Sequence, residues 1–493
     1  MREFLRYLCI ACCCLVSALA QAREPEAPGF RDLLPAGEFQ TRLQAALKEI
    51  GNPGKLADSR APVIGLQIAE RYAGGAAEQL DIQPGDVVFR VDSEIVWGGS
   101  WKLTGKKRQK LQIYSQRENQ VRTEFVSADR LGVDTRYFWR PELAFLRGKQ
   151  RSKGYDEAMI VAAVFRGRDP DLAESCLAQA VKQGYAPDNL SHQLGLEIAL
   201  IHNHPEVASQ FADLLAPQFE TDPTIHPVLI LRSALANGQF ELAYRVLKHQ
   251  DRHQDEELDP VSYLAAAEWQ RRIVAAQPVP PKSPASLAQE MTVDDLESKL
   301  QGAAYHSIKT HIPALLRGDG ILLKSQTGGD VHYALLQSPQ PCLNFDITTH
   351  LRIRADDLAV ASAEINSARV SLWASHRPDD LNTNAGFDYI LAGIEFQSFH
   401  KFGLQFGNFS NRIWLFDSSL QETTGSVHKV RFIRVGPQIE VFLNGHRVLL
   451  APAAEEIKPM DIEFRVSGMT LEVPRVEFKE LIKPVSASVT APK

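Results

Sequence analysis

The chain has 493 residues, which is too many for a single hydrophobic core and predicts roughly three domains. Hydrophobic residues make up 44% and charged residues 23%, a balance that is ordinary for a globular protein and excludes a wholly disordered chain. The net charge is −6 and no long basic run occurs, which argues against a nucleic-acid partner.

The first 22 residues have the pattern of a secretory signal peptide. Arg2 and Arg6 precede an apolar run, Leu8–Leu19, and a small-x-small cleavage pattern ends at Ala20 or at Ala22. The run is short for a membrane span, so an uncleaved anchor is the less favoured alternative. Residues 1–22 therefore predict a secreted or periplasmic protein with no membrane span after signal cleavage.

Two cysteines, Cys176 and Cys342, lie outside this leader. They fall in different predicted domains, so no disulfide framework is expected even though the predicted compartment is oxidising. Each is expected to be a small buried hydrophobic residue.

A polar, proline-containing linker and one helix occupy residues 23–54. Apolar residues recur at helical spacing over Phe39–Ile50, which predicts an amphipathic helix. We expect this helix to pack on the domain that follows it.

The next domain, residues 55–148, begins with a strand and a tight turn. The alternating run Val63–Ile68 predicts a strand, a short Ala-rich helix follows, and Pro84, Gly85 and Asp86 form a structural turn into a second strand. This order of elements resembles a bacterial PDZ domain, and a hairpin over residues 111–126 would close its fold.

The PDZ resemblance implies a peptide-binding strand in which backbone amides capture a terminal carboxylate and the peptide adds as a new strand. The residues that would do so are Ile64, Gly65, Leu66, Gln67 and Ile68. The facing helix of the family is short or absent here, because glycines interrupt the segment between Val96 and Leu111. The alternative is a PDZ fold that serves only as a docking surface.

Residues 149–277 contain an internal repeat of helical character. Ala173, Ala208 and Ala243 are 35 residues apart (208 − 173 and 243 − 208), and an acidic residue stands two positions before each. This period resembles degenerate tetratricopeptide-like repeats, which implies stacked helical hairpins with a groove for a protein partner. A plain structural spacer is the alternative.

A proline-rich linker over residues 278–299 leads to a region of short alternating strands, residues 300–484, and a tail, residues 485–493. A hairpin that turns at Asn444 and Gly445 is the most recognisable part. The region resembles a concanavalin A-like jelly roll, a fold of lectins, glucanases and keto-disaccharide hydrolase-like domains.

No pair of catalytic carboxylates is evident in this region. Glu395 is isolated, and Asp461 with Glu463 lacks a third acid, so we expect ordinary strand residues on the solvated face. If sugar binds, the candidate contacts are Trp373, His376, Asp380, Asn382 and Asn384. No histidine or cysteine spacing predicts a metal site, and no cofactor is expected.

The sequence therefore predicts a multidomain α+β chain: a PDZ-like β-barrel, an α-helical hairpin array and then an all-β jelly-roll sandwich. The expected function is a secreted or periplasmic binding or scaffold protein, not an enzyme, whose partners are protein or peptide C-termini, with glycans as a second class of ligand. One alternative is a carbohydrate-active hydrolase with an accessory PDZ domain. A second is a PDZ-bearing adaptor of an envelope protease.

Overall fold

The computed structural model describes the helical and N-terminal parts nearly completely and the last part as separate strands. The described residues are 29–51, 60–71, 74–96, 103, 107–128, 131–147, 153–222, 224–250, 289–294, 315–317, 320–324, 331–337, 344–354, 367–373, 390–397, 401–407, 412–416, 427–436, 438–452, 461–467 and 470–482. The predicted signal peptide, Cys342 and the tail lie outside the described residues.

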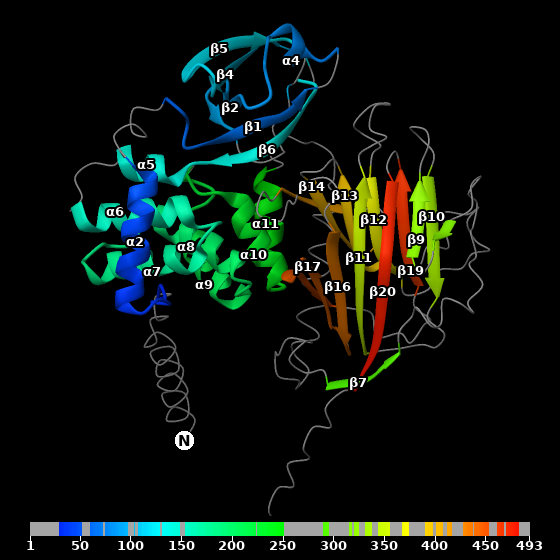
Figure 1. Ribbon diagram of the computed structural model, residues 1–493. Helices are drawn as coiled ribbons and strands as arrows, with labels where there is room; N and C mark the ends of the chain where they lie inside the picture. The colour runs from blue at the N-terminus through cyan, green and yellow to red at the C-terminus, as the bar shows by residue number, and fades with distance from the viewer. Residues whose placement is uncertain are drawn as a thin grey trace, which may run out of the picture.

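The chain combines one helical region with antiparallel sheets, as the sequence predicts (Figure 1). An N-terminal sheet lies above the helices, and a two-sheet sandwich lies beside them. Among the described residues, no helix is both long enough and apolar enough to cross a bilayer.

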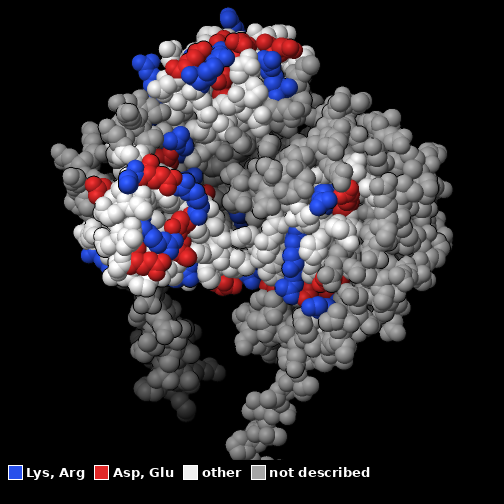
Figure 2. All heavy atoms as spheres, viewed as in Figure 1, with Lys and Arg blue, Asp and Glu red and all other residues white. Residues whose placement is uncertain are grey.

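Helix α2 (Ala36–Ile50) packs on helices α6 (Lys153–Phe165) and α7 (Pro170–Lys182). The expectation that it packs on the neighbouring sheet is wrong, because its buried residues join the helical core and its ion pairs reach the same helices. Arg42 pairs with Asp169, and Glu49 lies 2.7 Å from Arg168. Acidic and basic side chains are interleaved on this face rather than separated by sign (Figure 2).

In the sequence, the N-terminal sheet therefore interrupts the helical region: it lies between α2 and the helices on which α2 packs. Its strands run in the order β5-β4-β2-β1-β6, with β3 paired to β2. The bounds are β1 (Ile64–Arg71), β2 (Val87–Val91), β3 (Glu94–Ile95), β4 (Gln109–Ser115), β5 (Gln120–Val126) and β6 (Val133–Trp139), with the short helix α4 (Ala76–Gln79) after β1. The β4–β5 hairpin is confirmed. Whether this sheet belongs to the PDZ family stays a prediction.

Helix α5 (Pro141–Arg147) leads from β6 back into the helices. The remaining helices are α8 (Asn189–Ile201), α9 (Pro205–Leu215), α10 (Pro227–Ala236) and α11 (Phe240–Gln250). Helix α6 packs on α7, α8 on α9 and α10 on α11. The three repeat alanines are fully buried in α7, α9 and α11, and Cys176 is buried in α7. Membership of the tetratricopeptide family stays a prediction.

The sandwich consists of two antiparallel sheets, which confirms the predicted all-β architecture. One sheet has the order β10-β19-β12-β13-β14-β15, and the other has β18-β17-β16-β11-β20-β9-β8, with β7 paired to β20. The strands are β7 (Gln289–Asp294), β8 (Leu315–Arg317), β9 (Gly320–Lys324), β10 (Val331–Gln337), β11 (Phe345–Arg354), β12 (Ser367–Trp373), β13 (Ile390–Gln397), β14 (Lys401–Gly407), β15 (Arg412–Phe416), β16 (Val427–Val435), β17 (Gln438–Leu443), β18 (His446–Pro452), β19 (Asp461–Ser467) and β20 (Thr470–Ile482).

Two local features of the sandwich can be compared with the sequence. Asn444 and Gly445 have φ angles of 52° and 87°, so the predicted tight turn is present. Strand β7, in contrast, falls inside the predicted linker 278–299 and extends the sandwich by pairing with β20. Its hydrogen-bonding partner is almost 200 residues away, so no local signal announces the pairing.

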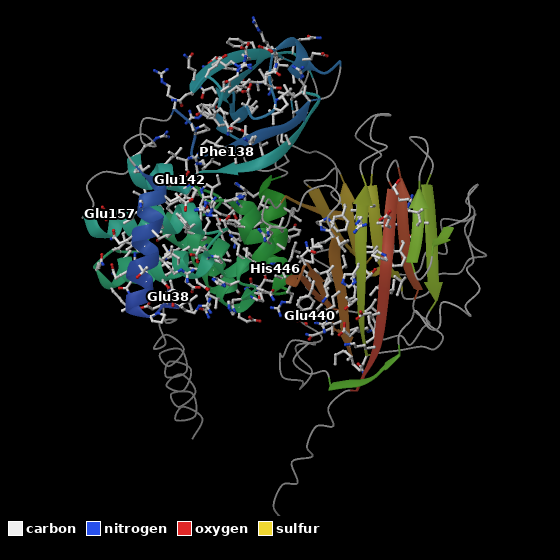
Figure 3. The ribbon with its side chains drawn as sticks, in the orientation of Figure 1. Glu38, Phe138, Glu142, Glu157, Glu440 and His446 are labelled. Atoms are coloured by element: carbon white, nitrogen blue, oxygen red, sulfur yellow. The ribbon has the colours of Figure 1, made fainter. Side chains whose placement is uncertain are left out.

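The helical region docks on the edge of the sandwich through Arg447 of β18. Its guanidinium contacts Glu440 of β17 at 3.0 Å, Glu206 of α9 at 3.1 Å and Asn237 at 3.2 Å. Its backbone N–H donates to Asn203 Oδ1 at 2.8 Å. Figure 3 shows Glu440 at this junction. Asn203 and Asn237, in the turns after α8 and α10, therefore bind the β17–β18 hairpin through Arg447.

Candidate functional site

The predicted peptide-binding strand is β1, and both of its edges are already paired. Leu66 lies opposite Val88 of β2 on one side and opposite Tyr137 of β6 on the other. The Ile68 N–H donates to Asp86 O, and the Ile68 carbonyl accepts from Gly85 N–H, each at 2.8 Å. A peptide cannot add to Ile64–Ile68 as a strand without displacing β2 or β6, so the structure corrects this prediction.

Gly65 has a packing role at this place in the sheet. A Cβ atom at Gly65 would lie 2.6 Å from Val87 Cγ1 and 2.9 Å from the Val88 carbonyl oxygen. The absence of a side chain therefore allows β1 and β2 to approach closely. The apolar-Gly-apolar pattern on which the peptide site was predicted is explained here by contact between strands.

The structural turn at Pro84, Gly85 and Asp86 is present. Gly85 has a φ of +95°, which glycine tolerates. The Asp86 carboxylate is buried and accepts from the backbone N–H of Gln83 and from Arg122 of β5, each at 3.1 Å. The turn therefore ties β5 to the start of β2.

Most of the predicted sugar contacts lie outside the described residues: His376, Asp380, Asn382 and Asn384. Trp373 ends strand β12, in the middle of the six-stranded sheet of the sandwich.

The six-stranded sheet has one apolar face and one polar face, which follow from its register. On the apolar face, Val370 lies opposite Phe464 of β19 and Ile394 of β13, and all three are fully buried in the core. Residues one position away point to the other face, because side chains alternate along a strand.

One row of the polar face crosses all six strands. Directly paired positions from β10 to β15 are Tyr333, Arg465, Arg369, Glu395, Gly403 and Trp414. The next row, from β10 to β15, is Leu335, Glu463, Ser371, Gly393, Gln405 and Arg412. The described side chains in these rows, among them Arg369, Glu395 and Glu463, share one face of the sheet, which we call the polar sheet face.

A buried ion pair lies at the centre of the polar sheet face. Arg369 is 2% exposed and donates to Glu463, which is 6% exposed. The two positions are diagonal neighbours on adjacent strands, within reach of long side chains. Glu395, 4% exposed, lies directly opposite Arg369 on the other side.

Glu395 and Glu463 lie away from the core, as the sequence predicts, but they are not the exposed strand residues that were expected. The sequence reasoning also missed Arg369. The signal for it was local: Ser367, Arg369 and Ser371 alternate with apolar residues in β12, which marks a strand with one polar face. The pairing of Arg369 with acids on β13 and β19 had no local signal.

Metal-binding geometry is not found in the part of the chain that the structure describes: no three His, Cys, Asp or Glu side chains there come together as ligands. The rings of His202 and His204 lie near each other, with centroids 6.0 Å apart and planes tilted by 38°, and His202 faces Asp171 and Glu174. These residues belong to the surface of α7–α9 that is considered below.

No protein-family model matches the chain, and no curated protein matches it. Among solved structures, it is similar to a sialidase at 13% identity and a TM-score of 0.27, over 39% of this chain but only 19% of the sialidase. It is similar to a carbohydrate-binding module from Bacillus subtilis at 11% identity and a TM-score of 0.25, over 36% of this chain and 95% of the module.

A third similar structure is the winged bean acidic lectin in complex with methyl-α-D-galactose, at 12% identity and a TM-score of 0.27, over 36% of this chain and 92% of the lectin. At these scores the likenesses carry no argument about function. The polar sheet face has to be judged from its own geometry.

Proposed function

We propose that this protein is a non-catalytic binding protein whose sandwich binds a carbohydrate on the polar sheet face. The observation that carries this proposal is the register of the sandwich sheet that runs from β10 to β15. It aligns aromatic, cationic and acidic positions in one row, from Tyr333 through Arg369 and Glu395 to Trp414.

The chemistry of these residues suits a polyhydroxylated ligand. A guanidinium donates several hydrogen bonds in fixed directions, and a carboxylate accepts them, so adjacent hydroxyl groups suit the two. Arg369, Glu395 and Glu463 are at most 6% exposed, so the proposal requires the surface above them to open when the sugar binds. Aromatic rings pack on apolar surface such as the face of a sugar ring. The ion pair of Arg369 and Glu463 is formed without a ligand, which reduces the ordering that binding requires.

Carbohydrate hydrolysis is the second candidate function, and one observation favours it. Glu395 and Glu463 lie on the same face of β13 and β19, the two strands that flank β12. The ion pair with Arg369 disfavours Glu463 as the proton donor, so a hydrolase built on this face would have to use Glu395 as its acid.

The other two parts are proposed to hold protein partners, in keeping with their PDZ-like and tetratricopeptide-like sequence patterns. Capture of a peptide C-terminus on β1 is no part of this proposal, since β2 and β6 occupy its edges. The leader pattern of residues 1–22 supports a secreted or periplasmic location.

The test is a glycan array with the purified chain, followed by titration of the strongest ligand. The variant Glu395→Gln removes the charge but keeps the shape, and we expect at least a tenfold loss of affinity with cooperative unfolding retained. Phe125→Ala is the matched control, because Phe125 is 48% exposed in the separate N-terminal sheet and should leave sugar binding unchanged.

Two results would contradict the proposal. Equal affinity of Glu395→Gln and the unchanged chain would remove the polar sheet face as the site. Release of reducing sugar that stops in Glu395→Gln would establish the hydrolase instead.

A further inference from the structure

Residues 29–34, the segment before α2, lie across helices α7, α8 and α9. We call this segment the strap. Phe30 stacks on Phe211 of α9, with ring centroids 5.2 Å apart and planes 25° from parallel. Arg31 makes two hydrogen bonds to Glu174 of α7, of 2.7 and 2.8 Å. The strap thus makes close contacts with residues more than 140 positions later in the chain.

The helices provide a space for the aromatic ring of the strap. A Cβ atom at Gly195, in the middle of α8, would lie 2.8 Å from Phe30 Cε1 and 2.7 Å from Phe211 Cζ. Glycine is unfavourable inside a helix, so its presence here calls for a packing reason. The missing side chain lets the rings of Phe30 and Phe211 stack against the helix.

The strap backbone is bound by side chains of α7. The N–H groups of Leu33 and Leu34 both donate to Ser175 Oγ, at 3.1 and 3.2 Å, and that of Arg31 donates to Glu174 Oε1 at 3.3 Å. Ser175 is fully buried and Glu174 is 5% exposed. Peptide-binding grooves hold extended segments in a similar way, by accepting hydrogen bonds from the backbone of the peptide.

The charge of the groove requires a cation from its occupant. A buried carboxylate is costly unless it is paired, and Arg31 supplies the bidentate partner of Glu174. His202 also faces Glu174, at 3.8 Å, and Asp171 at 3.5 Å. The outer side of the strap is solvated: Lys182, which pairs with Asp32, is 58% exposed. The buried contact of Arg31 with Glu174, rather than the solvated contact of Asp32 with Lys182, therefore determines which segment the groove binds.

We propose that this surface of α7–α9 is a peptide-binding groove and that the strap is its built-in, exchangeable occupant. The groove fits an extended protein segment in which an aromatic residue is followed directly by arginine and, three positions later, by leucine, as in Phe30, Arg31 and Leu34. Such a partner has to displace the strap, whose attachment to α2 gives it a high effective concentration. The groove lies on other elements than the polar sheet face, so either proposal can fail alone.

The test uses the full chain and a fluorescent peptide with the sequence of residues 29–35, Gly-Phe-Arg-Asp-Leu-Leu-Pro. The double variant Phe30→Ala/Arg31→Ala weakens the strap, and we expect it to bind the peptide at least tenfold more tightly than the unchanged chain. Adding Glu174→Gln should abolish that gain. A peptide with alanine in place of its phenylalanine and arginine is the matched control.

Peptide binding that is equally weak in the double variant and in the unchanged chain would overturn the proposal, and so would a double variant that does not fold. Hydrogen exchange of the unchanged chain provides a second measurement. The Leu33 and Leu34 amides should exchange at least tenfold faster than the core amides of α7, because the strap opens alone. Exchange at the same rate as the core would show a purely structural strap.

Discussion

The helical region and the sandwich bury ionisable side chains in different ways. In the sandwich, buried charges pair with each other at two places: Arg369 with Glu463, and Arg447 with Glu440, which is fully buried. In the helical region burial lowers the pKa of His226 well below its ordinary value, and the nearby Arg232 lowers that pKa further. Burial likewise raises the pKa of the Cys176 thiol, so both groups are neutral at pH 7.

Glu174 is the informative case in the helical region, because the guanidinium that hydrogen-bonds to it comes from the strap. A strand always has neighbours at fixed spacing that can supply a partner, whereas a helix in a close-packed array offers mostly apolar contacts. A paired buried charge is present at both surfaces that we propose as binding sites, the polar sheet face and the groove under the strap, as it is at the contact of Arg447 with Glu440.

The largest effect is expected from removing the central cation of the sandwich. Arg369→Leu leaves Glu463 and Glu395 buried without this cation, and the loss of one member of a buried pair costs about 3–5 kcal/mol. Hydrogen exchange of the sandwich amides measures the loss. In the double variant Arg369→Leu/Glu463→Leu we expect much of the stability to return, and a double variant as unstable as the single one would contradict the paired-charge account.

A smaller effect is expected in mild acid, and only in the helical region. The pKa of His226 is lowered by folding, so the unfolded chain takes up a proton first, at pH values below about 6.5. The free energy of unfolding should then fall by about 1.4 kcal/mol for each pH unit below that value, until the folded-state pKa is reached.

Hydrogen exchange between pH 7 and pH 5.5, corrected for the intrinsic rate, checks this expectation, and His226→Asn should reduce the slope. Because its buried charges are paired, the sandwich should show little change in protection over the same range. An equal loss of protection in both regions would contradict the proposed difference between the helical region and the sandwich in their response to pH.

The smallest effect is expected at a sandwich ion pair that reaches the surface. Arg352 lies opposite Glu472 at 3.4 Å, and their side chains are 42% and 25% exposed. Arg352→Leu should cost less than about 1 kcal/mol, since solvent screens such pairs. A cost as large as that of Arg369→Leu would show that ion pairing itself, rather than burial, sets the penalty.

Much of the fold could be predicted from local patterns. Alternation of apolar residues gave most strands of the sandwich, and Asn444 with Gly445 gave its tight turn. The 35-residue spacing of the repeat alanines matches three buried positions in three helices. Strand β7 was missed because it depends on pairing with β20, and α2 was assigned to the wrong neighbour for the same kind of reason.

The site was less predictable than the fold. Glu395 and Glu463 could be found as acids on the non-core face, because side-chain direction follows from alternation along one strand. Their burial and their relation to Arg369 could not be found, because these depend on which strands are neighbours. For the same reason, the free edge expected at Leu66 is closed by β6, which comes about 70 residues later.

The sequence by itself determined which segments are helix or strand and which face of each is apolar, since both follow from the periods of the two backbones. Only the tertiary structure decided that the N-terminal sheet is an insertion, that β1 is interior, that Arg369 lies between two acids and that residues 29–34 cover α7–α9. Those outcomes are contacts between residues far apart in the chain, and their free energy depends on the partner as well as on the local sequence.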